Sequence, residues 1–148
     1  MFSSIIVGTD GSSTAAAAVE QAINLAAKVR ARLLIVSAYE PISELRLREE
    51  LRSAPSDAQW VVSPREDVLA VLERSHQLAQ EGGVEDVETF ARQGDAADAI
   101  IDIAEEQGCD LIVVGNRGMT GAKRFLLGSV PNKISHHAPC SVLIVRTT

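Results

Sequence analysis

The sequence predicts an α/β fold in which one open, parallel sheet of five strands carries helices on both faces. Four short segments are almost wholly apolar and rich in β-branched residues, which is typical of strands covered on both faces. Segments with the helical spacing of apolar residues lie between them, so strands and helices alternate along the chain. The 148 residues are 46% apolar and 3% aromatic, and they suffice for one domain, 1–148, with a core of Val, Ile, Leu and Ala.

The strands are expected where these apolar runs lie. The four runs cover residues 5–7, 33–36, 111–114 and 142–145. Between the second and the third run, residues 87–91 alternate apolar and polar side chains, which favours a half-exposed strand at an edge of the sheet.

The first two helices are expected from spacing and end signals. Apolar residues recur at helical spacing over 13–30. Ser63, Pro64 and Glu66 form a typical helix start, and Gly82 with Gly83 ends the helix that follows. Between these two helices, and after the second strand, residues 41–62 contain two prolines and the only tryptophan and follow no single period. We expect a mobile insertion there, with one short helix over 44–52.

The last two helices are expected after the third and fourth strands. Asp95 is placed to cap a helix whose apolar face includes Ala97 and Ile100. The final helix is expected over 129–137, with Ser129 as its capping residue. The resulting order is β-α-β-α-β-α-β-α-β.

The expected ligand site lies beyond the carboxyl ends of the strands, where the winding of such a sheet reverses. The first and fourth strands are natural neighbours at that point. The segments that follow them, 8–11 and 115–118, are polar and rich in glycine.

The stretch 115–129 carries the most specific pattern, Gly-x2-Gly-x9-Gly-Ser, at Gly115, Gly118, Gly128 and Ser129. Glycines let backbone N–H groups approach a phosphate, and a helix N-terminus favours negative charge. The stretch is not a Walker A loop, and no GxGxxG follows the first strand.

This spacing resembles the ATP-binding signature of the universal stress protein family, and the resemblance extends along the whole chain. It includes the opening Ile-Val-Gly-Thr-Asp-Gly-Ser, the segment Leu-Leu-Gly-Ser-Val and the closing Pro-Cys-Ser-Val-Leu-Ile-Val. The resemblance implies the adenine nucleotide alpha hydrolase-like fold with strand order 3-2-1-4-5. It also implies an ATP-binding regulatory protein that acts as a nucleotide-dependent switch in a stress response, with or without Mg²⁺.

The resemblance further implies roles for particular residues. Asp10 would accept hydrogen bonds from the ribose hydroxyls, although it could also be only a turn residue. Ala38 would face the adenine. The remaining implied contacts are Gly8 and Thr9 beside the base, and Gly115, Asn116, Arg117, Gly118, Gly128, Ser129 and Val130 around the phosphates. Pro131 removes one N–H donor near this helix start.

Three alternatives stay open beside ATP-dependent regulation. Cyclic AMP is the alternative ligand, and a nucleotide-independent scaffold or a slow ATPase are the alternative functions. We expect no enzyme and no metal site, because no nucleophile lies beside a base and His136 and His137 are adjacent on a helix and point in different directions.

Charge and cysteine content restrict the partners and the compartment. The net charge of −6 argues against nucleic acid and anionic membranes, yet the first 110 residues carry −11 and the last 38 carry +5. A small anion is therefore expected near the last segment, unless that basic surface has no ligand. No apolar stretch or leader suggests a membrane or secretion. Cys109 and Cys140 are expected as buried thiols of a cytoplasmic protein, with a disulfide as the alternative.

The last strand, 142–145, is expected at a sheet edge with unpaired backbone groups. Such apolar edges associate unless they are covered. We expect a homodimer in which this strand pairs with its counterpart, as the resemblance also suggests. The sequence indicates no particular protein partner.

Overall fold

The computed structural model describes residues 1–39, 64–116 and 127–147. The insertion expected at 41–62, with its short helix at 44–52, lies outside these ranges. The described elements, in chain order, are β1 (Ser4–Gly8), α1 (Ser13–Val29), β2 (Arg32–Tyr39), α3 (Pro64–Glu81), β3 (Val87–Gln93), α4 (Ala96–Gln107), β4 (Leu111–Gly115), α5 (Ser129–His137) and β5 (Ser141–Val145). The predicted alternation of strands and helices is confirmed.

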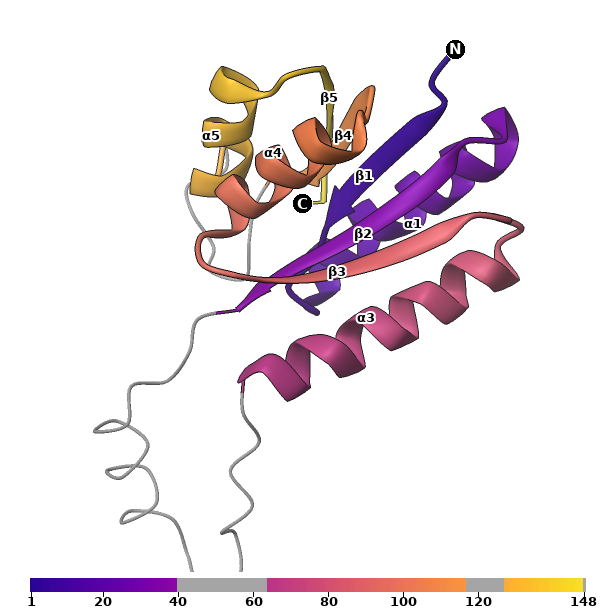
Figure 1. The fold of residues 1–148 in the computed structure, drawn as a ribbon, viewed down its shortest axis with the longest axis horizontal. Coiled ribbons are helices and arrows are strands. Elements are labelled where there is room, and N and C mark those ends of the chain that lie inside the picture. Colours follow the sequence, from indigo (N-terminus) through magenta and orange to yellow (C-terminus); the bar gives the residue numbers. More distant parts are fainter. Residues whose placement is uncertain (40–63, 117–126, 148) are drawn as a thin grey trace, which may run out of the picture.

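The five strands form one parallel sheet in the order β3-β2-β1-β4-β5 (Figure 1). In the centre, Ile5 of β1 pairs with Leu33 of β2 on one side and with Leu111 of β4 on the other. This order is the one predicted, and β3 and β5 lie at the two edges. The carboxyl ends of β1 and β4 are therefore adjacent.

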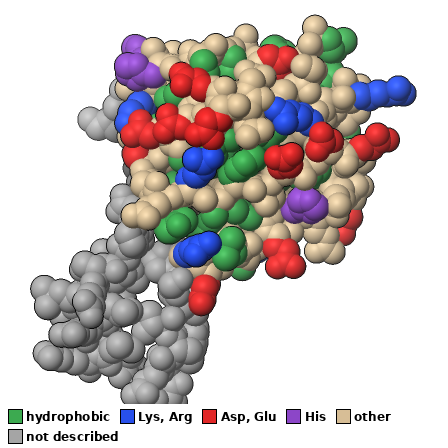
Figure 2. Space-filling view, viewed as in Figure 1, with side chains coloured by type: hydrophobic (Ala, Val, Ile, Leu, Met, Phe, Trp, Pro, Cys, Tyr) green, Lys and Arg blue, Asp and Glu red, His purple; other side chains and the backbone are tan. Residues whose placement is uncertain are grey.

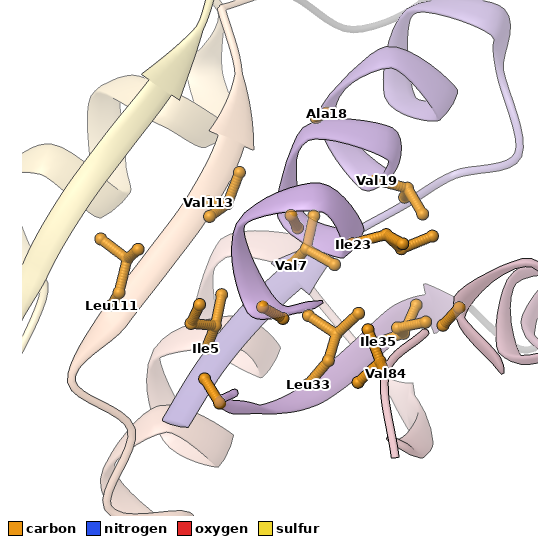
Figure 3. Packing of buried hydrophobic residues seen from close by; sticks show 14 of the residues in the cluster. Ile5, Val7, Ala18, Val19, Ile23, Leu33, Ile35, Val84, Leu111 and Val113 are labelled. Carbon is orange, nitrogen blue, oxygen red and sulfur yellow. The ribbon is translucent and has the colours of Figure 1, made fainter. Parts of the chain in front are cut away.

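The apolar runs of the central strands arise because helices cover both faces of the sheet. On one face, α1 and α3 pack over side chains such as Ile5, Val7 and Leu33 (Figure 3). On the other face, α4 and α5 pack over Ile6 and Leu34, among others. Successive strand residues point to opposite faces, so each residue of a central strand meets an apolar layer.

Side-chain caps start two of the helices. Ser12 Oγ accepts from the N–H of Ala15 at the start of α1, and Asp95 caps α4 by accepting from the N–H of Asp98. The expectation that Ser129 caps α5 is wrong. The capping residue is Gly128, in extended conformation, and Ser129 already belongs to the helix.

The two cysteines are free thiols. Cys109 is buried as expected, whereas Cys140 is only half-buried, so the expectation of burial is wrong for Cys140. Burial raises the pKa of both thiols. None of the helices in the described ranges is long and apolar enough to span a membrane.

Candidate functional site

A cavity of about 290 Å³ opens at the carboxyl ends of β1, β2 and β4, beside the first turns of α4 and α5. Its wall is lined by Gly8, Thr9, Asp10, Ala15, Val36, Ala38, Ala96, Ile100, Val114, Gly115, Gly128, Ser129, Val130 and Pro131. The cavity therefore lies where the order of the strands predicts a ligand site.

Most of the residues predicted for the site lie around this cavity. They are Gly8, Thr9, Asp10, Ala38, Gly115, Gly128, Ser129 and Val130. Asn116 does not line the cavity, because its side-chain oxygen accepts hydrogen bonds from Thr147 instead. Arg117 and Gly118 lie outside the described residues.

Sequence reasoning missed five apolar residues of the wall. They are Ala15, Val36, Ala96, Ile100 and Val114. Val36 and Val114 are the last residues of two predicted strands. Because ligands bind at the carboxyl ends of such strands, the sequence indicated that these two residues could line the site. Ala96 and Ile100 follow the predicted cap Asp95, and only the packing of α4 over the sheet brings them to the cavity.

The loop between β1 and α1 is held against the neighbouring strand. The N–H of Thr9 donates to the carbonyl of Val36 in β2 at 2.9 Å. Gly11 then adopts a positive φ of 82°, which favours glycine, and its N–H donates to Thr9 Oγ1 at 3.1 Å. These contacts fix the backbone that leads from β1 to Asp10.

Asp10 is both a turn residue and an available acceptor. Its Oδ1 accepts from the N–H of Ser12 at 2.9 Å, which stabilises the turn before α1. Its Oδ2 accepts no hydrogen bond from any residue in the described ranges, and the side chain is exposed at the cavity. The two roles considered for this residue are therefore compatible.

The start of α5 presents backbone donors to the same cavity. The N–H of Gly128 donates to the carbonyl of Asn116 at 2.9 Å. The next two N–H groups, of Ser129 and Val130, donate to no residue that the structure describes, and Pro131 has no N–H. Unpaired N–H groups and the helix dipole make this end favourable for an anion.

The missing side chain of Gly8 serves the packing of α4. A Cβ atom at Gly8 would overlap the side chain of Ile100, which lines the cavity. A larger residue at position 8 would displace the side chain of Ile100 from its present place in the wall. Gly8 therefore contributes to the shape of the wall whether or not a ligand is bound.

Asp10 is the only ionisable side chain among the described residues that line the cavity. Of the basic residues after Asp110, Lys133 is paired with Asp95 and Asp98 of α4 at 3.3 and 2.8 Å. The hydrogen bond to Asp98 raises the pKa of Lys133, and Asp95 adds to the effect. The pKa of Asp95 is lowered, first by the N–H of Asp98 and further by Lys133.

The face shown in Figure 2 carries basic side chains among acidic ones rather than in one patch. His136 and His137 are exposed at the end of α5, with ring centroids 6.4 Å apart. Within the described ranges, no three His, Cys, Asp or Glu side chains form a group that could hold a metal ion.

Comparison with known proteins assigns the family. The sequence model of the universal stress protein family matches residues 1–146. Universal stress protein Rv1636 of Mycobacterium tuberculosis is 36% identical, over 99% of this chain and 98% of that protein. Universal stress protein YxiE of Bacillus subtilis is 35% identical, over 99% of this chain and 100% of that protein.

A solved structure also resembles this chain. A crystal structure of a universal stress protein in complex with cAMP is 31% identical, covers 99% of this chain and 98% of that chain, and superposes with a TM-score of 0.73. The sheet order and this structural neighbour confirm the predicted adenine nucleotide alpha hydrolase-like fold. The chain belongs to the universal stress protein family.

Proposed function

We propose that this chain is an adenine-nucleotide-binding regulatory protein whose ligand is ATP, and whose bound state acts as a switch in a stress response. One observation carries the proposal. A single cavity combines an available carboxylate oxygen of Asp10, the small side chain of Ala38, and the unpaired N–H groups of Ser129 and Val130 next to two glycines. A nucleoside phosphate needs a hydroxyl acceptor, an apolar slot and an anion site in this arrangement.

Each part of the ligand has a matching part of the cavity. Asp10 accepts from the ribose hydroxyls, and Ala38 faces the adenine in a cavity that Val36 and Ile100 also line. The phosphates lie at Gly115 and Gly128, where no side chain obstructs the backbone. Arg117 and Gly118, outside the described residues, complete the phosphate contacts in this proposal, and Mg²⁺ accompanies the triphosphate.

Cyclic AMP is the second candidate ligand. The 31%-identical solved structure contains cAMP, which favours it by similarity. A cyclic phosphate leaves only one ribose hydroxyl free, so Asp10 has one donor less to accept from. It also places a single phosphate charge at the start of α5, where ATP places three phosphates. Comparing the two affinities in one experiment decides between them.

We propose regulation rather than catalysis. Within the described lining, Thr9 Oγ1 accepts from the N–H of Gly11, and Asp10 is the only side chain that could act as a base. Asp10 reads hydroxyls in this proposal and activates no water. Phosphate release from bound ATP is therefore expected to stay far below usual enzymatic rates of about one per second or faster.

Calorimetric titration of the parent protein and of Gly128→Val with ATP, cAMP and GTP tests the site. Gly128 has φ −61° and ψ 167°, an extended conformation that Val adopts without strain, so the fold is expected to persist. The added side chain occupies the space proposed for a phosphate, and we expect ATP affinity to fall by a factor of about 10 or more. GTP is expected to bind weakly, because the small apolar contact at Ala38 leaves polar groups of guanine without partners.

Ser135→Val, on the exposed side of the same helix, is the matched control and should bind ATP like the parent protein. Unchanged ATP binding in Gly128→Val would place the ligand elsewhere. A parent protein that binds neither ATP nor cAMP would leave the nucleotide-independent scaffold as the function.

We also propose a cytoplasmic homodimer. The free thiols Cys109 and Cys140 support a reducing compartment. Edge strand β5 supports dimerisation, because it pairs only with β4 among the described strands and Leu143 within it is 41% exposed.

A further inference from the structure

Asn116 joins three separate parts of the fold directly behind the cavity. Its N–H donates to the carbonyl of Val145, the last residue of β5, at 2.9 Å. Its carbonyl accepts from the N–H of Gly128, the capping residue of α5, also at 2.9 Å. Asn116 itself follows Gly115, the last residue of β4. One residue thus connects the ends of two strands with the start of a helix.

The side chain of Asn116 extends this junction beyond β5. Its Oδ1 accepts from both the N–H and the Oγ1 of Thr147, each at 2.8 Å. Both groups are partly buried, and these bonds span 31 residues of sequence. With its oxygen engaged by Thr147, the side chain of Asn116 is absent from the cavity wall.

The junction links the two glycines that line the phosphate end of the cavity. Gly115 is held in β4, in register with Val145 of β5, and is followed by Asn116, whose carbonyl is bonded to the N–H of Gly128. Val145 and Thr147 hold Asn116 in place through hydrogen bonds to its N–H and to its Oδ1. A site that binds through backbone N–H groups depends on such fixed geometry, because no flexible side chain can compensate for a shift.

We propose that Asn116 and Thr147 form a positioning pair that sets the phosphate end of the nucleotide site, and that Asn116 is not itself a phosphate ligand. This inference rests on the proposed function. Loosening the pair lets Asn116 move, which separates Gly115 from the start of α5. The adenosine end, built on Asp10 and Ala38 from β1 and β2, stays in place. The pair therefore acts on affinity for phosphates and not on affinity for the nucleoside.

The test compares binding of ATP and of adenosine in variants of Thr147. Thr147→Val removes the hydroxyl bond, and ATP affinity is expected to fall about 3- to 10-fold. Thr147→Pro removes the N–H as well and leaves no donor for Asn116, so the fall should be larger. Thr147→Ser keeps both donors and should bind like the parent protein. Adenosine affinity should change less than about twofold in all three, whereas general loosening of the fold would weaken both ligands.

Asn116→Ala, alone and combined with Thr147→Val, separates positioning from direct contact. If the residues act as a pair, the double variant binds ATP no more weakly than Asn116→Ala alone. Thr89→Val, which removes an exposed hydroxyl from β3, is the matched control and should have no effect. In the ligand-free protein, the amide hydrogen of Gly128 should exchange faster in Asn116→Ala and Thr147→Pro than in the parent protein.

The possible failures are distinct. ATP binding by the parent protein that is unchanged in Thr147→Val and Thr147→Pro overturns the positioning pair and leaves the nucleotide site intact. Additive losses in the double variant assign Asn116 a direct contact instead. A parent protein that binds no adenine nucleotide overturns the proposed function, and with it the inference that rests on it.

Discussion

Asp110 anchors the amino-terminal end of the sheet, opposite the cavity. Its carboxylate accepts from the N–H of Ser3 at 2.9 Å, from Ser3 Oγ at 3.0 Å and from the N–H of Ser4 at 3.0 Å. Burial alone would raise the pKa of Asp110, but these donors outweigh burial and lower it from its usual value of 3.8. Asp110 thereby ties the start of β1 to the start of β4.

Asp110→Asn is expected to reduce the free energy of unfolding by about 0.5–1.5 kcal/mol at pH 7, because the amide NH₂ would face a backbone N–H donor at a partly exposed site. The folded pKa lies below the unfolded one, so the carboxylate stabilises the fold above about pH 4 and loses this effect as pH falls through the folded pKa. Urea unfolding at pH 7, 5 and 3 should therefore show a difference between variant and parent that shrinks toward pH 3. Asp86→Asn, at an exposed position, is the control. A stability difference between Asp110→Asn and the parent protein that does not change with pH would contradict the role assigned to the carboxylate.

The helices α4 and α5 are joined by Lys133, which reaches from α5 to Asp95 and Asp98 at the start of α4. The first turns of both helices line the cavity, so this contact connects its two helical walls. All three side chains are about half exposed, and exposed ion pairs contribute little and are screened by salt. Asp95 has a second role that does not depend on Lys133, since it caps α4.

Salt should separate these two roles of Asp95. Lys133→Met is expected to lower the urea midpoint slightly in dilute buffer and not at all in 1 M NaCl, where screening acts over about 3 Å. Asp95→Ala is expected to cost about 1 kcal/mol in both conditions, because the cap bond to the N–H of Asp98 is local. Lys28→Met, at the exposed end of α1, is the control. An effect of Lys133→Met that persists unchanged in 1 M NaCl would show that packing, not charge, joins the helices.

At the scale of the whole molecule, local sequence patterns predicted what depends on neighbours in the chain. The strands were found because both faces of a central strand are covered, and α4 because Asp95 is a local cap. The cap of α5 lies one residue earlier than predicted. Gly128 is the capping residue because its backbone is extended and its carbonyl accepts from the N–H of Asn132, and the N–H of Gly128 is also bonded to Asn116, a long-range contact that no local pattern shows.

The residues of the candidate site also fall into two groups, those that local patterns predict and those that depend on tertiary packing. Residues near the carboxyl ends of strands, such as Asp10 after β1 and Gly115 at the end of β4, line the cavity because parallel strands end at one edge. Asn116 also follows a strand, but its side-chain oxygen accepts a hydrogen bond from Thr147, which lies after β5 in the chain. The side chain of Ile100 lies at the cavity in space that a side chain at Gly8 would occupy. Contacts of this kind depend on tertiary packing, which spacing alone does not encode.

The outer edge of β5 determines how the whole molecule associates. Its partner β4 satisfies one side of the strand, and no other described strand pairs with the opposite side. An apolar edge of this kind favours pairing with a second copy, and a lysine on an edge strand opposes such pairing. Leu143→Lys is therefore expected to convert a dimer into a monomer in light scattering at about 10–50 µM, within the range in which transient association is measured.

Leu69→Lys is the matched control, because Leu69 of α3 is 46% exposed and Leu143 is 41% exposed. Both variants add the same charge and remove similar apolar surface, so a general effect on solubility would appear in both. The proposed interface requires that only Leu143→Lys dissociates the dimer. A parent protein that is monomeric at these concentrations contradicts the homodimer itself, and a Leu143→Lys variant that stays dimeric moves the interface away from β5.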